Sequence, residues 1–153
     1  MKNLENRIPP PVLAMALALL MAATARLAPS ESLPGAARQA GAALLGALAL
    51  GFAVPGIGAF LRAGTTINPV DIEKASLLVT GGIFGVTRNP MYVALTALLT
   101  AWAFGLGSPW GFAGPLIFAV FIHRFQILPE ERALGLKFGT EYAAYRRRVR
   151  RWL

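Results

Sequence analysis

The charged residues of this chain are confined to a few positions, and the intervals between them are long and apolar. One interval runs from residue 8 to 25, a second from 39 to 61, and a third from 89 to 122. A helix needs about 20 apolar residues to cross a bilayer, so each of the first two intervals fits one span. The third is too long for one span and long enough for two short ones.

The sequence GLGSPWG at 105–111 interrupts the third interval, and its Gly and Pro residues predict a tight turn between two helices. The pattern therefore predicts an all-α integral membrane protein with four transmembrane helices, at about 9–28, 38–61, 90–106 and 109–128. Composition agrees, because 56% of the residues are hydrophobic and 14% are charged. Soluble domains carry about 25% charged residues.

The first apolar interval has an alternative interpretation. Lys2 and Arg7, the apolar residues from Val12 onward, and the sequence ATA at 23–25 also resemble a cleavable signal peptide. However, the interval is long enough to span, and the three prolines at 9–11 suit the start of a helix. We therefore expect a retained first span.

Basic residues are distributed unequally between the two predicted sides of the membrane. Segment 124–153 carries eight Lys or Arg against three Glu, and it falls on the same side as the N-terminus. The opposite side keeps only Arg26, Glu31 and Arg38. The positive-inside rule then predicts a multi-pass protein of the cell membrane with both termini in the cytoplasm. With a net charge of +8, the expected partner is anionic lipid, not nucleic acid.

Small residues recur at every fourth position of the second predicted span. They are Ala43, Ala47, Gly51, Pro55 and Ala59. Stripes of this kind let membrane helices approach one another closely. We therefore expect this face of the helix to pack against its neighbours.

A first polar motif, TGGIFGVTRNPMY at 80–92, precedes the third predicted span. Asn89 followed by Pro90 predicts an N-cap and the first helical residue. Arg88 also fits the positive flank of a span, and Tyr92 an interfacial aromatic. The glycines of this motif allow the backbone to approach a ligand closely.

A second motif lies in the C-terminal segment. Pro129, Glu130 and Glu131 are typical of the first turn of a new helix. Apolar residues then recur on one helical face, surrounded by Lys and Arg; they are Leu134, Phe138, Tyr142, Tyr145, Val149 and Trp152. This pattern predicts a C-terminal amphipathic cytoplasmic helix that lies on anionic lipid.

Together, the two motifs resemble the isoprenylcysteine carboxyl methyltransferase family and the related phospholipid N-methyltransferases. The resemblance covers about residues 63 to 152, with EERALGLKFGTEYAAYRRRV following the first motif by about forty residues. It implies one membrane-embedded domain over 1–153, with two spans in 1–62 and a cofactor-binding half in 63–153. It also implies an enzyme that binds S-adenosylmethionine on the cytoplasmic side. The family often has histidine where this chain has Asn89, and asparagine occurs in bacterial-type relatives.

The chemistry of S-adenosylmethionine fits the residue types in these motifs. Arg88 can pair with its carboxylate through a fork of donors, and Glu130 or Glu131 can accept its ammonium group or a ribose hydroxyl. The candidate cofactor-binding residues are Gly81, Gly82, Arg88, Asn89, Pro90, Tyr92, Glu130, Glu131 and Tyr142. The candidate catalytic residues are Arg88, Asn89 and Tyr92, because methyl transfer rests largely on positioning and electrostatics.

The expected methyl acceptor is a lipophilic molecule that enters from the bilayer. A carboxylate acceptor, with a pKa of about 4, is already ionised and needs no general base. An amine acceptor needs one, and the single histidine, His123, lies at the end of the fourth predicted span. We therefore expect a carboxylate, with a phospholipid-type amine as the alternative.

Two further classes of protein are open to the sequence. A small proton-coupled transporter requires an acidic residue inside a span, and none of the four predicted spans contains Asp or Glu. These patterns do not distinguish an enzyme from a non-catalytic membrane scaffold. The chain has no cysteine and no spaced histidines, which excludes disulfides and thiolate sites and predicts no metal site.

Overall fold

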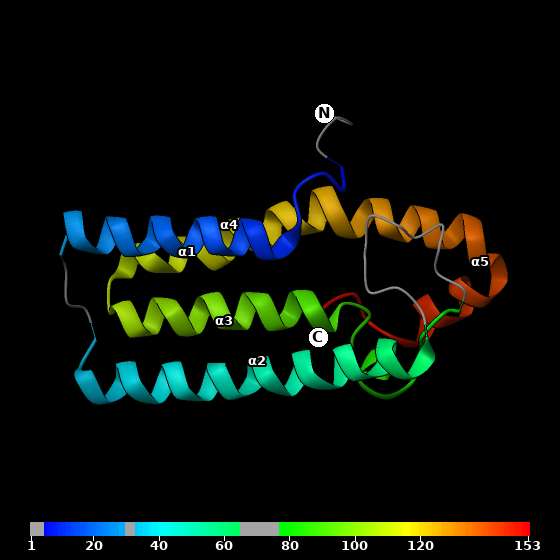
Figure 1. The fold of residues 1–153 in the computed structure, drawn as a ribbon, viewed down its shortest axis with the longest axis horizontal. Coiled ribbons are helices and arrows are strands. Elements are labelled where there is room, and N and C mark those ends of the chain that lie inside the picture. Colours follow the sequence, from blue (N-terminus) through cyan, green and yellow to red (C-terminus); the bar gives the residue numbers. More distant parts are fainter. Residues whose placement is uncertain (1–4, 30–32, 65–76) are drawn as a thin grey trace.

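The structure, a computed structural model, describes residues 5–29, 33–64 and 77–153. It is a bundle of long helices arranged side by side (Figure 1). The main helices are α1 (Pro10–Leu27), α2 (Gly35–Ala63), α3 (Pro90–Leu106), α4 (Ala113–Ile122) and α5 (Leu128–Arg148). Short helical turns are η3 (Gly82–Gly85), η4 (Pro109–Phe112) and η5 (His123–Ile127). The described residues contain no named strand, so the predicted all-α class is confirmed for this part of the chain.

Proline and glycine set the boundaries of the bundle helices. α3 begins with Pro90 in its first turn, where the missing N–H of proline leaves no helical bond unmade. It ends at Gly107, which takes the left-handed conformation (φ 68°) that closes a helix C-terminus. The turn between α3 and α4 therefore falls where the sequence predicts it. That turn lies at the opposite end of α3 from the C-terminal residues of the chain (Figure 1).

Three helical segments are long and apolar enough to cross a membrane: α1, α2, and the continuous stretch Pro109–Arg148. The third predicted span, α3, is apolar but has only 17 residues. At 1.5 Å per residue, α3 is about 26 Å long, somewhat less than the roughly 30 Å core of a bilayer. Each predicted span thus corresponds to a helix near the expected position, and α3 is shorter than the others.

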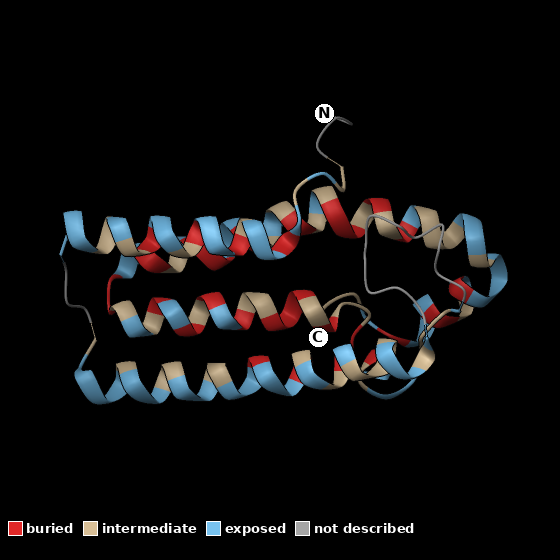
Figure 2. Ribbon diagram, viewed as in Figure 1, coloured by how far each residue is buried: buried red, intermediate tan, exposed pale blue. Residues whose placement is uncertain are grey.

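The core of the bundle lies around α3, which contacts α1, α2 and α4. Buried residues gather on α3 and on the sides of its neighbours that face it (Figure 2). Leu17 of α1, Leu99 of α3 and Phe118 of α4 belong to one buried cluster. The first helix is therefore an integral part of the packed bundle. Large apolar side chains such as Leu44 and Val120 face outward, as expected for helices surrounded by lipid.

The stripe of small residues on α2 faces inward only in its second half, so the prediction was wrong for the first half. Ala43, Ala47 and Gly51 are exposed, and Pro55 and Ala59 are half-buried. The residues that α2 buries are Ala49, Phe52 and Gly56. Alanine and glycine occur on several faces of this helix, and a spacing of four does not select among them. The apolar bulk of Phe52 and the contacts of Phe104 from α3 determine which face turns inward.

The C-terminal helix does not begin anew at Pro129, contrary to the sequence prediction. α4 continues without a break through the π-helical turn η5 into α5. Pro129 has no N–H, so the carbonyl of Phe125 has no α-helical partner. It accepts the backbone N–H of Asn6 at 3.0 Å instead, which joins the N-terminal segment to this point of the helix.

The predicted continuous apolar face of the C-terminal helix is also interrupted. Gly139 has φ 49° and ψ −119° inside α5, which divides the helix into two pieces that meet at a kink. Tyr142, Tyr145 and Val149 form one buried cluster, but Val149 already has extended backbone. Trp152 lies beyond the helix and packs against the bundle core.

The close approach of α2 and α3 at Gly41 leads to a test of this packing. A Cβ at Gly41 would overlap the ring of Phe104, which itself packs edge-on against Phe112 at 5.1 Å. We expect Gly41→Ala to reduce stability by about 1–3 kcal/mol through overpacking, measured by thermal unfolding in detergent. Gly51→Ala, on the exposed stripe of the same helix, is the control and leaves stability unchanged or higher. Equal losses in the two variants would contradict the observed packing face.

Candidate functional site

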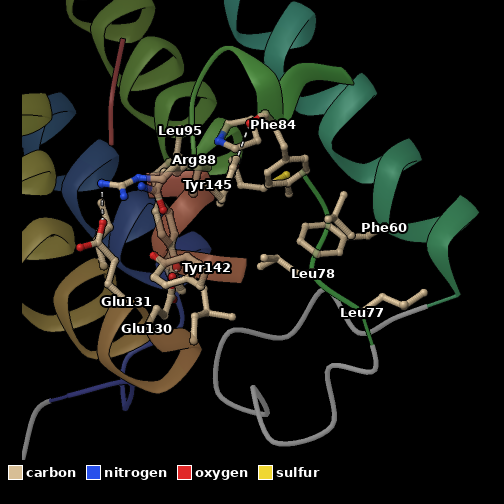
Figure 3. A pocket seen from close by; sticks show the side chains of 18 of the residues that line it. Phe60, Leu77, Leu78, Phe84, Arg88, Leu95, Glu130, Glu131, Tyr142 and Tyr145 are labelled. Carbon is tan, nitrogen blue, oxygen red and sulfur yellow. Dashed lines mark hydrogen bonds and ion pairs between the residues drawn. The ribbon is translucent and has the colours of Figure 1, made fainter. Parts of the chain in front are cut away.

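A cavity of about 260 Å³ lies at the end of the bundle where α1 and α3 begin and α2 ends. Its lining comes from the start of α1, the end of α2, the segment before α3, the first turns of α3, and α5. Figure 3 shows apolar side chains of Phe60, Leu77 and Leu78 on one side and Arg88 with Glu131 on the other. The cavity is therefore apolar with one charged end.

The charged end depends on the residues that follow α5, Val149–Leu153, which we call the C-terminal tail. The tail runs beside the segment that precedes α3, with a parallel bridge between Thr87 and Arg150. The N–H of Arg88 donates to the carbonyl of Arg150 at 2.9 Å. The carbonyl of Arg151 accepts from the Thr87 hydroxyl at 3.2 Å and from Asn89 Nδ2 at 2.8 Å. These hydrogen bonds fix the C-terminal tail against the segment before α3.

Asn89 occupies the predicted N-cap position of α3, but its side chain does not cap the helix. Its amide donates to the tail instead, and the Thr87 hydroxyl accepts the N–H of Asn89 at 3.2 Å. Thr87 is fully buried. The polar residues before α3 therefore fix the tail as well as begin the helix.

Glu131 is the centre of an ion cluster at this end of the cavity. Arg151 donates to it through a fork, from Nε to Oε1 at 2.9 Å and from Nη2 to Oε2 at 2.7 Å. Arg88 Nη2 lies 2.9 Å from Oε1, and Arg146 Nη2 is 4.0 Å from Oε2. The side chains of Arg88 and Glu131 are each only 9% exposed. Paired charges with such geometry are the form in which proteins bury ions.

These charges alter the acid–base behaviour of the cluster, which lies in the charged part of the chain beyond the apolar stretch that ends near Leu128. Burial works to raise the pKa of Glu131, but the hydrogen bond from Arg151 and the charges of Arg88, Arg151 and Arg146 together lower it. The same hydrogen bond raises the pKa of Arg151. Glu131 is therefore an ionised carboxylate at neutral pH.

Arg88 uses only part of its hydrogen-bonding capacity within the described residues. One of its guanidinium nitrogens, Nη2, contacts Glu131. Among the residues that the structure describes, Nε and Nη1 have no hydrogen-bond acceptor although both are buried. A buried donor without an acceptor costs about 1–3 kcal/mol, and more when it is charged. A guanidinium in this state beside a cavity is suited to receive an anionic group of a ligand.

Glu130 forms a second polar pair in the cavity, with Tyr92. The Tyr92 hydroxyl donates to Glu130 Oε1 at 2.5 Å, and both residues line the cavity. The pKa of Glu130 is raised to about 7 in all: burial raises it most, the hydrogen bond from Tyr92 lowers it in part, and the nearby charge of Glu131 also raises it. Glu130 therefore changes charge near neutral pH, unlike its neighbour.

Further aromatic side chains line the cavity. Phe60, at the end of α2, packs edge-on against Phe84 of η3, with ring centroids 5.2 Å apart. The Tyr145 hydroxyl donates to the carbonyl of Phe84 at 2.7 Å, and Tyr142 packs beside Tyr145. The kinked end of α5 is thereby fixed against the segment before α3 (Figure 3).

The structure brings most of the sequence-predicted site residues together. The ones that line the cavity are Arg88, Asn89, Pro90, Tyr92, Glu130, Glu131 and Tyr142. Gly81 and Gly82 begin η3 and are not among the lining residues. Gly82 has φ 61°, so the glycines serve the chain turn, and their contact with a cofactor stays a prediction. His123 opens the π-helical turn and does not line the cavity.

Sequence reasoning missed Arg151 and Phe84. Arg151 stands in RRRVRR, where six positions hold five arginines, and spacing alone does not single out the one that reaches Glu131. Phe84 sits within the glycine-containing motif, and only the helical turn of η3 shows that its ring faces the cavity. A signal for Arg151 is present in the pair of adjacent acids, since buried acids require basic partners.

Comparison with known proteins identifies the group to which this arrangement belongs. The family model described as phospholipid methyltransferase matches residues 37–141, which is more than half of the chain. The chain belongs to the phospholipid methyltransferase family. The resemblance found in the two motifs is thereby confirmed, and family membership places the chain among membrane methyltransferases.

A second comparison gives a relative without a described activity. An uncharacterized protein of Haemophilus influenzae is 46% identical over 63 residues, which is 41% of this chain and 100% of that protein. No solved structure matches the chain at a significant level. The family match ends at residue 141. The C-terminal tail of this phospholipid methyltransferase family member therefore lies outside the matched region.

Proposed function

We propose that this protein transfers a methyl group from S-adenosylmethionine to a lipophilic acceptor that partitions into the membrane. The observation that carries the proposal is the buried Arg88 guanidinium at the charged end of an otherwise apolar cavity, because two of its donors have no acceptor among the described residues. Family membership supports the reaction class. The acceptor and the cofactor contacts are inferred from the chemistry of the lining residues.

The residues at the charged end fit the methionine part of the cofactor. Its carboxylate matches the free Nε and Nη1 of Arg88, because a guanidinium fork suits a carboxylate. Its ammonium group matches Glu130, which has a carboxylate oxygen beyond the one that Tyr92 occupies. Glu131 is already satisfied by arginines, so we assign it to holding Arg88 and not to the ligand. Tyr142 and Tyr145 offer aromatic faces to the adenine.

S-adenosylmethionine supplies the electrophilic methyl group when it is bound. The protein's part is to orient and to exclude water, which suits an in-line displacement. Arg88 is held from behind by Glu131, and Tyr92 fixes one oxygen of Glu130. The apolar side chains around them lower the local dielectric and strengthen both interactions.

The acceptor is proposed to enter from the bilayer beyond the closely packed part of α2 and α3, where α2 ends and α1 and α3 begin. Phe60 from the end of α2 and Leu95 from α3 both line the cavity, so an apolar chain finds apolar surface on this route. A lipid-like molecule with its polar head at the interface fits such a site. A carboxylate head needs no proton acceptor and is our first candidate.

An amine acceptor is the second candidate, and Glu130 is the observation that favours it. An amine must lose a proton before it attacks. Glu130 lines the cavity and has a pKa raised to about 7 by burial. The sequence leaves His123 and the glutamates as candidate bases, and of these Glu130 lines the cavity while His123 does not. The two candidates therefore differ in whether Glu130 is required for turnover.

We also propose that the cavity lies at the cytoplasmic face of the cell membrane, with both termini cytoplasmic. The basic residues of α5 and the tail surround this end of the bundle, as the positive-inside rule requires, and exposed Arg147 and Arg148 are available to anionic lipid. A reporter enzyme fused after Leu153 is expected to be active only in the cytoplasm. Activity of that fusion on the outer side would reverse the orientation.

Cofactor binding can be measured by calorimetry on the detergent-solubilised protein. We expect Arg88→Ala and Glu130→Gln each to weaken S-adenosylmethionine binding roughly ten- to hundredfold, the usual loss for one charged hydrogen bond. Because a protonated Glu130 does not attract an ammonium group, wild-type affinity should fall as the pH drops below about 7. That dependence should be absent in Glu130→Gln. Arg147→Ala, an exposed arginine of α5, is the control, and equal affinity in all variants would remove both residues from the site.

The acceptor class can be tested with labelled cofactor at saturating concentration and a panel of membrane-partitioning carboxylates, amines and thiols. For a carboxylate acceptor, we expect Glu130→Gln to retain turnover once the cofactor is saturating. For an amine acceptor, the rate should rise through about pH 7 as Glu130 loses its proton, and Glu130→Gln should lower it by about a hundredfold or more. Methylation of amines alone would reject the carboxylate candidate.

A further inference from the structure

The fork between Arg151 and Glu131 limits how many hydrogen bonds Glu131 can accept from Arg88. Arg151 engages both oxygens of Glu131, at 2.9 and 2.7 Å. Arg88 is left with a single contact, from Nη2 to Oε1 at 2.9 Å. A carboxylate accepts one guanidinium in the bidentate arrangement most favourably, so the two arginines compete for that arrangement, and Arg151 occupies it.

We propose that Arg151 is a positioning residue: by occupying the fork on Glu131, it keeps Nε and Nη1 of Arg88 free for the ligand. This inference rests on the proposed function, since the ligand in question is the cofactor carboxylate. Without Arg151, Glu131 is free to form the fork with Arg88 and to occupy a second of its nitrogens. The tail thereby determines how many donors the site presents.

The tail is built to hold Arg151 in this place. The carbonyl of Arg151 accepts two hydrogen bonds from Thr87 and Asn89, and the preceding carbonyl, of Arg150, accepts the N–H of Arg88. Trp152 packs against the bundle core on the other side. The segment that carries Arg88 and the tail that carries Arg151 are thus fixed to each other through their backbones.

The neighbouring charges are consistent with this division of roles. Glu131 is faced by Arg88 from the segment before α3, by Arg146 and Tyr142 from α5, by its neighbour Glu130, and by Arg151 from the tail. Burial raises the pKa of Glu131 and is the largest single effect. Of the effects that lower this pKa, the hydrogen bond from Arg151 is the largest. Removal of Arg151 therefore raises the pKa of Glu131.

The test compares Arg151→Ala and Arg151→Lys with Arg150→Ala in the full-length protein. Arg150 is the preceding residue of the same tail, and its side chain is exposed. Its substitution keeps the backbone hydrogen bonds of the tail and does not alter the fork between Arg151 and Glu131. We expect Arg151→Ala to bind S-adenosylmethionine about tenfold more weakly or worse, because Glu131 then occupies a donor of Arg88 that the cofactor carboxylate needs, and one charged hydrogen bond is worth about this much. Arg151→Lys keeps the charge without the fork and should fall between Arg151→Ala and wild type. Arg150→Ala should bind like wild type.

A second measurement needs no ligand. Infrared titration of the ligand-free protein, with Glu131→Gln to assign the carboxyl band, reports the protonation of Glu131. The midpoint should shift to higher pH in Arg151→Ala and stay unchanged in Arg150→Ala. A general loss of packing does not produce a shift that is specific to this carboxyl.

The outcomes separate the two proposals. If the wild-type protein does not bind S-adenosylmethionine, the proposed function fails, and the infrared shift still decides whether Arg151 controls Glu131. If the wild-type protein binds and Arg151→Ala binds equally well, Arg151 has no positioning role. The same conclusion follows if the Glu131 midpoint does not move. Should Arg151→Ala fail to fold, the affinity and midpoint of Arg151→Lys against Arg150→Ala give the answer.

Discussion

One buried carboxylate joins three separate parts of this chain. Glu131 on α5 binds Arg88 from the segment before α3 and Arg151 from the C-terminal tail. Because an unpaired charge in such surroundings costs several kcal/mol, none of the three side chains can be placed independently. The backbone pairing of residues 87–89 with the tail and the kink of α5 at Gly139 are the arrangements that allow all three to meet.

The division of labour between the adjacent acids follows from this constraint. Glu131 is neutralised by arginines and is committed to structure around the site. Glu130, one residue earlier on the helix, accepts a hydrogen bond from Tyr92 and has a pKa near 7. Successive helical residues differ by about 100° in direction, so a pair of acids reaches two different environments. Their distinct environments, and not their identity, assign them distinct roles.

Much of the architecture could be predicted from the sequence because the intervals between charges encode the lengths of spans. The grouping of Arg88, Tyr92 and Glu130 was also predictable, since both motifs flank the same end of a helical hairpin. The packing face of α2 was not, because small residues occur all round that helix. Nor was the end of α5, since the apolar periodicity continues past Gly139 and Arg148, where the backbone has already changed direction.

The difference in length between α2 and α3 determines how deep the site lies. α2 and α3 contact each other closely at Gly56 and Pro90, where a Cβ on Gly56 would be 3.6 Å from the proline ring. The seven residues of α2 that follow, 57–63, extend about 10 Å beyond the start of α3. Because α2 extends past the start of α3, a recess remains above the N-terminus of α3, where the helix dipole carries partial positive charge. The depth of the recess is therefore fixed by where Pro90 allows α3 to begin, and an α3 extended by one turn at this end would fill it.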